Sequence, residues 1–105
     1  LQIFIEFDDC HRQATTYQGL GNVAVLMKEY EESHKNYQKA LHIYVEIGDR
    51  PNQAHTHYLL GLLAAAEGNA AKAIACLQQA MDIFTEFGDE YYMAIVQQNL
   101  DRLSE

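Results

Sequence analysis

Basic residues, proline, cysteine and tryptophan are scarce or absent in this chain of 105 residues. Seven lysines and arginines stand against fifteen aspartates and glutamates, which gives a formal net charge of −8. This charge argues against nucleic acid and against an anionic membrane as partners, because both require a basic protein surface. A single proline and the lack of strand-like alternation argue against a β-rich fold.

The two cysteines, Cys10 and Cys76, lie far apart and fit no paired spacing. We therefore expect reduced thiols and a cytoplasmic protein. The longest apolar run, residues 59–66, is far too short to cross a membrane, and no segment is typical of a signal peptide.

The sequence does contain an internal repeat of forty residues. Gly48–Asp49 recurs as Gly88–Asp89, and residues 14–49 align with residues 54–89 without a gap. A repeat of this length is typical of a solenoid built from stacked units. The register divides the chain into the end of a preceding repeat (1–9), two complete repeats (10–49 and 50–89) and the first helix of a further repeat (90–105). We therefore expect a single domain that is a piece of a longer array.

Each repeat has the composition and apolar spacing of two antiparallel helices. Gly48 suits the left-handed residue that ends a helix, and Asp49 suits the N-cap of the next one. The predicted fold is all-α, an α-solenoid of antiparallel helix pairs. The helices are expected at about 10–27, 30–47, 50–67, 70–87 and 90–103, after a short helical tail at 1–7.

Small residues predict where the paired helices cross. Gly21 and Gly61 occupy equivalent positions, and we expect the second helix of each repeat to approach the first closely there. Leu20 is expected to face the same core. Asp101 falls in the register of the two glycines, which predicts either that no second helix crosses the last helix tightly or that the repeat degenerates there.

The pattern of a tyrosine followed by Leu20–Gly21, Ala24, Tyr37 and Ala40 resembles a tetratricopeptide repeat (TPR). A second copy of the pattern comprises Leu60–Gly61, Ala64, Ala73, Leu77 and Ala80. The forty-residue form with Gly-Asp between repeats resembles kinesin light chains, Pins-type scaffolds and bacterial TPR regulators of the Rap kind. The resemblance implies a right-handed superhelix whose first helices line a concave groove that binds a peptide.

Carried over by register, the resemblance implies a set of groove-facing residues. Asn22 is the best single candidate, because an amide can both donate to and accept from a peptide backbone. The alternative for Asn22 is a hydrogen bond to water or to a neighbouring helix, and the alternative for Tyr58 is packing on the adjacent helix. The peptide-binding residues expected are Thr15, Gln18, Asn22, Val25, His55, Tyr58, Leu62, Gln98 and Arg102.

No catalytic, cofactor or metal site is expected. His55 and His57 point to different sides of a helix, and His34 is expected to be a half-buried core residue. His11 and His42 lack partners at zinc spacing, and no phosphate loop or nucleophile motif is present.

We therefore expect a non-enzymatic protein-interaction module. The alternative is a regulatory or sensor arm of a larger signalling enzyme or transcription regulator. The partner is expected to be a protein or peptide, with self-association through the open terminal helices as a further expectation. The apolar residues behind that expectation are Leu1, Ile3, Phe4 and Phe7 at one end and Met93, Ile95, Val96, Leu100 and Leu103 at the other.

Overall fold

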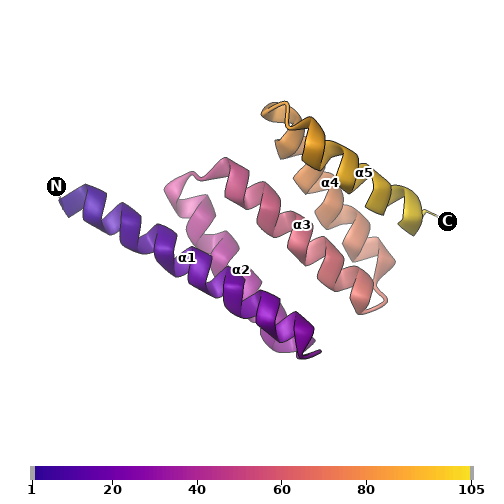
Figure 1. Ribbon diagram of the computed structural model, residues 1–105, viewed down its shortest axis with the longest axis horizontal. Coiled ribbons are helices and arrows are strands. Elements are labelled where there is room, and N and C mark those ends of the chain that lie inside the picture. Colours follow the sequence, from indigo (N-terminus) through magenta and orange to yellow (C-terminus); the bar gives the residue numbers. More distant parts are fainter. Residues whose placement is uncertain (1, 105) are drawn as a thin grey trace. The chain divides into compact units, whose positions relative to one another are not determined.

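Five α-helices make up the chain in the computed structural model (Figure 1). The structure describes the backbone of residues 2–104 and the side chains of residues 8–104, and no strand occurs among these residues. The helices are α1 (Gln2–Leu26), α2 (Tyr30–Ile47), α3 (Arg50–Ala66), α4 (Ala70–Glu86) and α5 (Glu90–Leu103). The predicted all-α fold of helix pairs is therefore confirmed. The hand of the superhelix stays a prediction.

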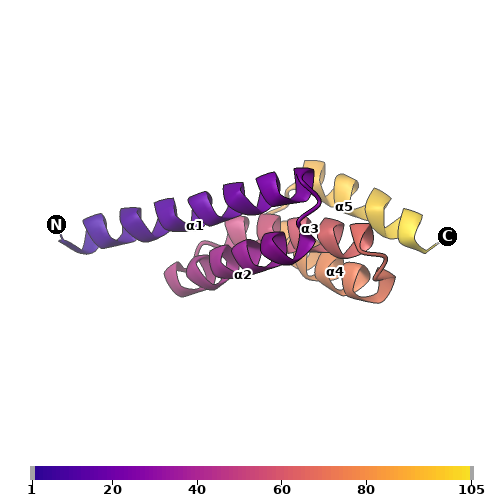
Figure 2. The ribbon, with the colours of Figure 1, turned by 90° about the horizontal axis from the view of Figure 1, so that it is seen from below.

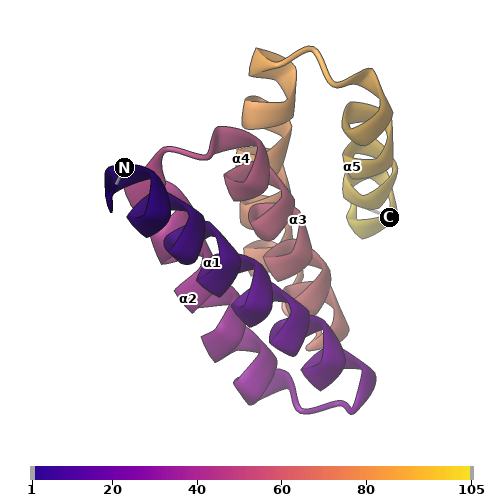
Figure 3. The same cartoon turned by 60° about the vertical axis from the view of Figure 1, so that its left-hand side comes forward.

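The chain divides into two compact units, Leu1–Arg50 and Pro51–Glu105. In the first unit, α1 and α2 lie side by side and run in opposite directions (Figures 2 and 3). Its core contains Ala14, Ala40 and Tyr44, with Tyr17, Ile43 and Ile47 partly buried around them. Alanine at the crossing lets the two backbones approach, so the large Tyr44 ring can be buried between them.

The second unit contains nearly all of α3 together with α4 and α5. Leu77 and Phe84 of α4 are buried in its core together with Val96 of α5. Met93, Leu100 and Leu103 of α5 pack partly buried against this core. Most of the apolar side of α5 is thus used inside the unit. The leading residues Leu1 to Phe7 lie outside the described side chains, and self-association stays a prediction.

The predicted break between a leading helix at 1–7 and a helix beginning at Cys10 is wrong, because α1 is continuous from Gln2 to Leu26. Asp8 takes the register position of Gly48 and Gly88, whose φ angles are 72° and 64°. A left-handed backbone is costly for a residue with a Cβ, whereas glycine adopts it freely. Asp8 therefore continues the helix where glycine would end it.

Leu20 is also placed differently from its prediction, because its side chain is 50% exposed. Helix α2 covers the side of α1 that carries Ala14, Gly21 and Ala24, all of which are buried. Leu20 precedes Gly21 and so lies about 100° around the helix from it. It therefore lies at the edge of the side that α2 covers, where half of its side chain remains exposed.

The four turns between helices share one backbone arrangement. In each turn a residue with positive φ follows the helix, namely Lys28, Gly48, Gly68 and Gly88. The next amide then donates to a carbonyl five residues back, as from Glu29 to Ala24 (2.8 Å) and from Asn69 to Ala64 (2.9 Å). These bonds satisfy carbonyls that the helix end leaves free. Lys28 is the one non-glycine residue at this position, with φ 60°.

Lys28→Gly is expected to raise the free energy of unfolding by about 0.5–1 kcal/mol, because glycine removes the left-handed strain. Gly68→Ala at the equivalent turn is expected to lower it by about 1 kcal/mol. An added Cβ at Gly68 would meet no atom within 4 Å, so backbone strain alone causes the loss. Urea unfolding followed by circular dichroism measures both changes. A loss of stability in Lys28→Gly would contradict this account of the turn.

Candidate protein-binding surface

The residues expected in the groove lie on the first helix of each pair, and we call this set the groove row. In the first unit α1 carries four of them, of which Asn22 and Thr15 are exposed and Gln18 and Val25 are half-buried. In the second unit the row continues on α3 and α5. Its members there are His55, Tyr58 and Leu62, which are half-buried, and Gln98 and Arg102, which are exposed.

Asn22 is held by a tyrosine from the paired helix. The hydroxyl of Tyr37 on α2 donates to Asn22 Oδ1 over 2.5 Å. Gly21 makes this contact possible, because a Cβ at that position would lie 2.5 Å from Tyr37 Cε1. The tyrosine ring therefore lies directly over the glycine, and its hydroxyl reaches the next residue. Asn22 thus makes a hydrogen bond to a neighbouring helix, which was the alternative expected for it. Its side chain nevertheless remains exposed at the surface.

One further group, the Ser33 hydroxyl, lies beside the Tyr37 ring and its hydroxyl. Ser33, which is fully buried, donates to the carbonyl of Gly21 over 2.9 Å and so joins α2 to α1 beside the ring. Burial raises the pKa of Tyr37, while a hydrogen bond with Ser33 lowers it. The phenol is therefore protonated at neutral pH and donates to Asn22. With Oδ1 already engaged, Asn22 retains the donor capacity of its NH₂ group.

The second repeat replaces this polar pair with an apolar one. Leu77 takes the register position of Tyr37, and Leu62 takes that of Asn22. Leu77 lies against Gly61 as Tyr37 lies against Gly21, because a Cβ at Gly61 would be 2.8 Å from Leu77 Cγ. The repeat that has a tyrosine hydroxyl at the α2 position thus also has an amide at the α1 position, and the repeat that lacks the hydroxyl lacks the amide. At this register position the groove row is accordingly polar in the first repeat, at Asn22, and apolar in the second, at Leu62.

Thr15 belongs to a polar cluster at the N-terminal half of α1. Its hydroxyl donates to the carbonyl of His11 (2.9 Å) and lies 3.3 Å from the hydroxyl of Tyr44. His11 Nε2 lies 3.2 Å from Asp49 Oδ2 and its ring meets Tyr44 edge-on, with 5.9 Å between centroids. These contacts tie α1 to the end of α2. The Thr15 hydroxyl is therefore engaged within the fold.

An aromatic cluster surrounds His55 and Tyr58 in the second unit. Both rings meet Tyr92 of α5, with centroid distances of 5.7 Å from His55 and 6.3 Å from Tyr58. Tyr92 in turn stacks on Phe84 of α4, at 4.9 Å and 11° between the ring planes. Tyr58 also packs partly buried against the core of this unit. The Tyr58 ring therefore packs in part on an adjacent helix, which is the alternative that we expected for it from the sequence.

Burial lowers the pKa of His55 below its usual value of 6.5. The imidazole is therefore neutral at pH 7, and it can donate through one ring nitrogen and accept through the other. At the surface of the aromatic cluster, it offers the same kind of hydrogen bonding as a backbone amide. Gln98 and Arg102 are four residues apart and therefore lie on the same side of α5. They add an amide and a cation to the groove row of the second unit.

Sequence reasoning missed the two residues that position this row, Tyr37 as the support of Asn22 and Tyr92 as the centre of the aromatic cluster. The sequence did contain a signal for Tyr92, because Gly88–Asp89 predicts a turn and an N-cap, which place Tyr92 in the first turn of the next helix. Asp89 Oδ1 accepts from the Tyr92 amide over 3.2 Å, which makes Asp89 the N-cap. A sequence signal also existed for Tyr37. Tyr37 and Asn22 are both polar in the first repeat, and their equivalents in the second repeat, Leu77 and Leu62, are both apolar, which indicates that the two positions are in contact.

Among residues with described side chains, no group of three histidines, cysteines or acidic residues is placed to hold a metal ion. Cys10 and Cys76 are free and half-buried, and burial raises the pKa of Cys76 while nearby Lys72 lowers it. No helix within the described part of the chain is long and apolar enough to cross a membrane. His34 is half-buried, in agreement with its prediction.

No match was found among the curated proteins with which the chain was compared. The family model described as tetratricopeptide repeat matches residues 12–86, which include most of α1, all of α2, α3 and α4, and both close glycine contacts. The match covers more than half of the 105 residues. The chain therefore belongs to the tetratricopeptide repeat family.

Proposed function

We propose that the chain is a non-catalytic module that binds a peptide or a partner segment along the groove row. Tetratricopeptide repeats generally mediate protein–protein interactions, which supports this class of function. The observation that carries the proposal is the exposed Asn22 amide, whose orientation is fixed by Tyr37. A side chain ordered before binding loses less conformational entropy when a ligand arrives.

The chemistry of the row favours an extended peptide over a charged head group. In the first unit Asn22 offers its NH₂ group to a backbone carbonyl, and in the second unit neutral His55 offers a donor and an acceptor. Leu62 and the exposed part of Tyr58 offer apolar contacts for ligand side chains. Only Arg102 of the row carries a full charge at neutral pH. Recognition is therefore expected to depend on backbone hydrogen bonds and shape.

Asn22→Ala is expected to weaken a peptide selected on this protein from a random display library by about tenfold, which corresponds to the loss of one well-oriented hydrogen bond. Tyr37→Phe keeps the ring over Gly21 but removes the bond that orients Asn22, and a smaller loss of affinity is expected. Calorimetry measures both affinities. The matched control is Asn99→Ala, because the Asn99 amide donates to the carbonyl of Ile95 in its own helix.

Equal affinity of wild type, Asn22→Ala and a Tyr58→Ala variant for the selected peptide would place the binding surface elsewhere. Circular dichroism spectra and thermal midpoints of all variants separate a loss of binding from a loss of folding. A control Asn99→Ala variant that weakened binding as much as Asn22→Ala would also contradict the assignment.

A further inference from the structure

His55, Tyr58 and Tyr92 of the second unit form a set of rings that we call the aromatic triad. The distances between ring centroids are 5.7 Å for His55 and Tyr92, 6.3 Å for Tyr58 and Tyr92, and 6.2 Å for His55 and Tyr58. The ring planes are inclined to one another by 42° to 81°, so no two rings of the triad are stacked. All three side chains are half-buried, and each therefore keeps part of its surface accessible. The triad thus presents aromatic surface to a ligand of the groove row, to which His55 and Tyr58 belong.

The packing of the repeat does not require rings at these positions. None of the residues in the same register of the other repeats is aromatic. These equivalents are Thr15 and Ile95 for His55, Gln18 and Gln98 for Tyr58, and Arg12 and Asn52 for Tyr92. A separate contact orients Tyr92, because its ring stacks on buried Phe84 at 4.9 Å and 11°. The triad is therefore particular to the second unit.

Negative charge surrounds the start of α5, where Tyr92 lies. Asp89 Oδ1 accepts a hydrogen bond from the Tyr92 amide over 3.2 Å, and exposed Glu90 is in the first turn. Their two full charges outweigh the partial positive charge of about +0.5 at a helix start. The lysine and arginine of the second unit, Lys72 and Arg102, lie at the ends of α4 and α5 that are remote from the turn joining these helices. Arg102 is about 15 Å from Tyr92 along the helix, which exceeds the screening length of about 8 Å. The start of α5 therefore attracts a cation.

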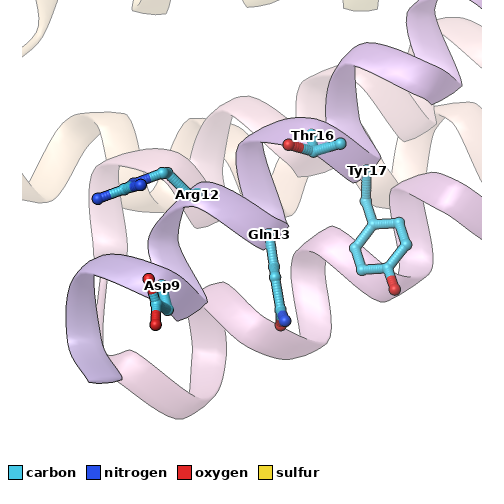
Figure 4. Close-up of a pocket in the computed structure, with 5 residues that line it drawn as sticks. All are labelled: Asp9, Arg12, Gln13, Thr16 and Tyr17. Carbon is cyan, nitrogen blue, oxygen red and sulfur yellow. The ribbon is translucent and has the colours of Figure 1, made fainter. Parts of the chain in front are cut away.

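Tyr17 in the first unit, by contrast, has cations of its own chain beside it. Lys39 Nζ lies 5.3 Å from the centre of the Tyr17 ring. The residues that line the open hollow on α1 at this ring are Asp9, Arg12, Gln13, Thr16 and Tyr17 (Figure 4). A cation from a ligand would compete with Lys39 for the ring and would be repelled by it. Tyr17 is therefore an internal comparison for the tyrosines of the triad.

We propose that the aromatic triad holds an arginine side chain of the ligand, an assignment that rests on the proposed function of the groove row. A guanidinium group is planar and weakly hydrated, and a tyrosine face attracts it within about 6 Å of the ring centroid. Asp89 and Glu90 add attraction for the positive charge. His55 does not oppose it at pH 7, because burial lowers the pKa of His55 and leaves the imidazole neutral. The triad thus adds one charged contact to recognition that otherwise depends on backbone hydrogen bonds and shape.

The test uses peptides selected on the whole chain from a random display library. Arginine is expected to recur in the selected sequences. Replacement of that arginine by citrulline, which is nearly isosteric but uncharged, is expected to weaken binding by about fivefold in calorimetry. The arginine and citrulline forms of one peptide then measure the arginine preference of each protein variant.

Tyr58→Leu and Tyr92→Leu are expected to remove the arginine preference, because leucine fills apolar space but offers no ring face. The two peptides are expected to bind either variant within about twofold of one another. Tyr17→Leu is the matched control and is expected to keep the preference, since its ring already lies beside Lys39. His55→Lys is the substitute if circular dichroism shows the leucine variants unfolded, because an ammonium group in the triad repels the guanidinium.

Asp89→Asn tests the charge without loss of the N-cap, because asparagine caps helices as well as aspartate does. The arginine preference is expected to fall by about half. Asp101→Asn is the control on the same helix and is expected to keep the full preference, because Asp101 lies near the opposite end of α5.

Equal affinity of wild type for the arginine and citrulline peptides would overturn the assignment, and so would selected sequences without arginine. A preference that persists in both leucine variants, or in His55→Lys, would overturn it as well. These results would leave the proposed function intact if Asn22→Ala still weakens the peptide. Loss of the preference in the leucine variants with unchanged affinity in Asn22→Ala would instead support the triad and contradict the role of Asn22.

Discussion

Gly61→Leu is expected to lower the free energy of unfolding by about 3 kcal/mol, through overpacking between α3 and α4. The first added carbon would lie 2.8 Å from Leu77 Cγ, 2.9 Å from Leu77 Cδ2 and 3.3 Å from the carbonyl oxygen of Ala73. Leu77 is fully buried and the Ala73 oxygen belongs to the backbone, so neither atom can move away cheaply. The remaining atoms of the leucine side chain add to the clash.

Gly19→Leu provides the control for the helix propensity of glycine. Gly19 lies in the middle of α1, and an added Cβ there would meet nothing within 4 Å. Leucine is a better helix former than glycine, so this variant is expected to be more stable by about 0.5–1 kcal/mol. Urea unfolding of both variants measures the difference. A Gly61→Leu variant as stable as wild type would contradict close packing at this crossing.

Leu77→Ala is the second change with a large expected effect. Leu77 is 0% exposed and lies in the core of the second unit with Phe84 and Val96. Truncation removes buried apolar surface and leaves a cavity, which costs about 2–5 kcal/mol. Leu26→Ala is expected to change stability by no more than about 0.5 kcal/mol, because a leucine that is 83% exposed buries little.

A double-mutant cycle connects the two positions. Leu77→Ala opens space beside Gly61, so Gly61→Ala is expected to cost less in the Leu77→Ala background than in wild type. Residues in direct contact show coupling of about 0.5–3 kcal/mol, whereas distant residues add. Strict additivity of the two changes in chemical denaturation would show that Gly61 and Leu77 do not share one space.

Most of the helical architecture could be predicted from the sequence because it depends on local signals. Gly48 and Gly88 follow helices with positive φ, which glycine adopts freely, and α2 and α5 begin and end at the predicted residues. The glycine at position 21 indicated a close approach, and Tyr37 lies against it. These features depend on residue size and backbone preference within one repeat, which the forty-residue register displays twice.

The predictions from sequence were wrong where the repeat departs from its own pattern, and where the exposure of a side chain depends on which neighbouring element covers it. The register predicted a turn at Asp8, but a Cβ-bearing residue there extends α1. Leu20 was assigned to the core by its spacing, yet spacing does not tell which of two adjacent sides of a helix is covered. The support of Asn22 by Tyr37 joins residues fifteen apart in sequence through a hydroxyl. That contact requires the crossing geometry, which a list of residue types does not contain.

Binding of a peptide along the groove row is tested most directly by mapping the chemical shifts of the backbone amides. The ligand is the peptide selected from a display library on the folded chain, added to isotope-labelled protein. We predict that the largest shifts occur on α1 around Asn22, on α3 around Tyr58 and on α5 around Gln98. Shifts confined to α2 and α4, with Asn22 and Tyr58 unaffected, would contradict the claim.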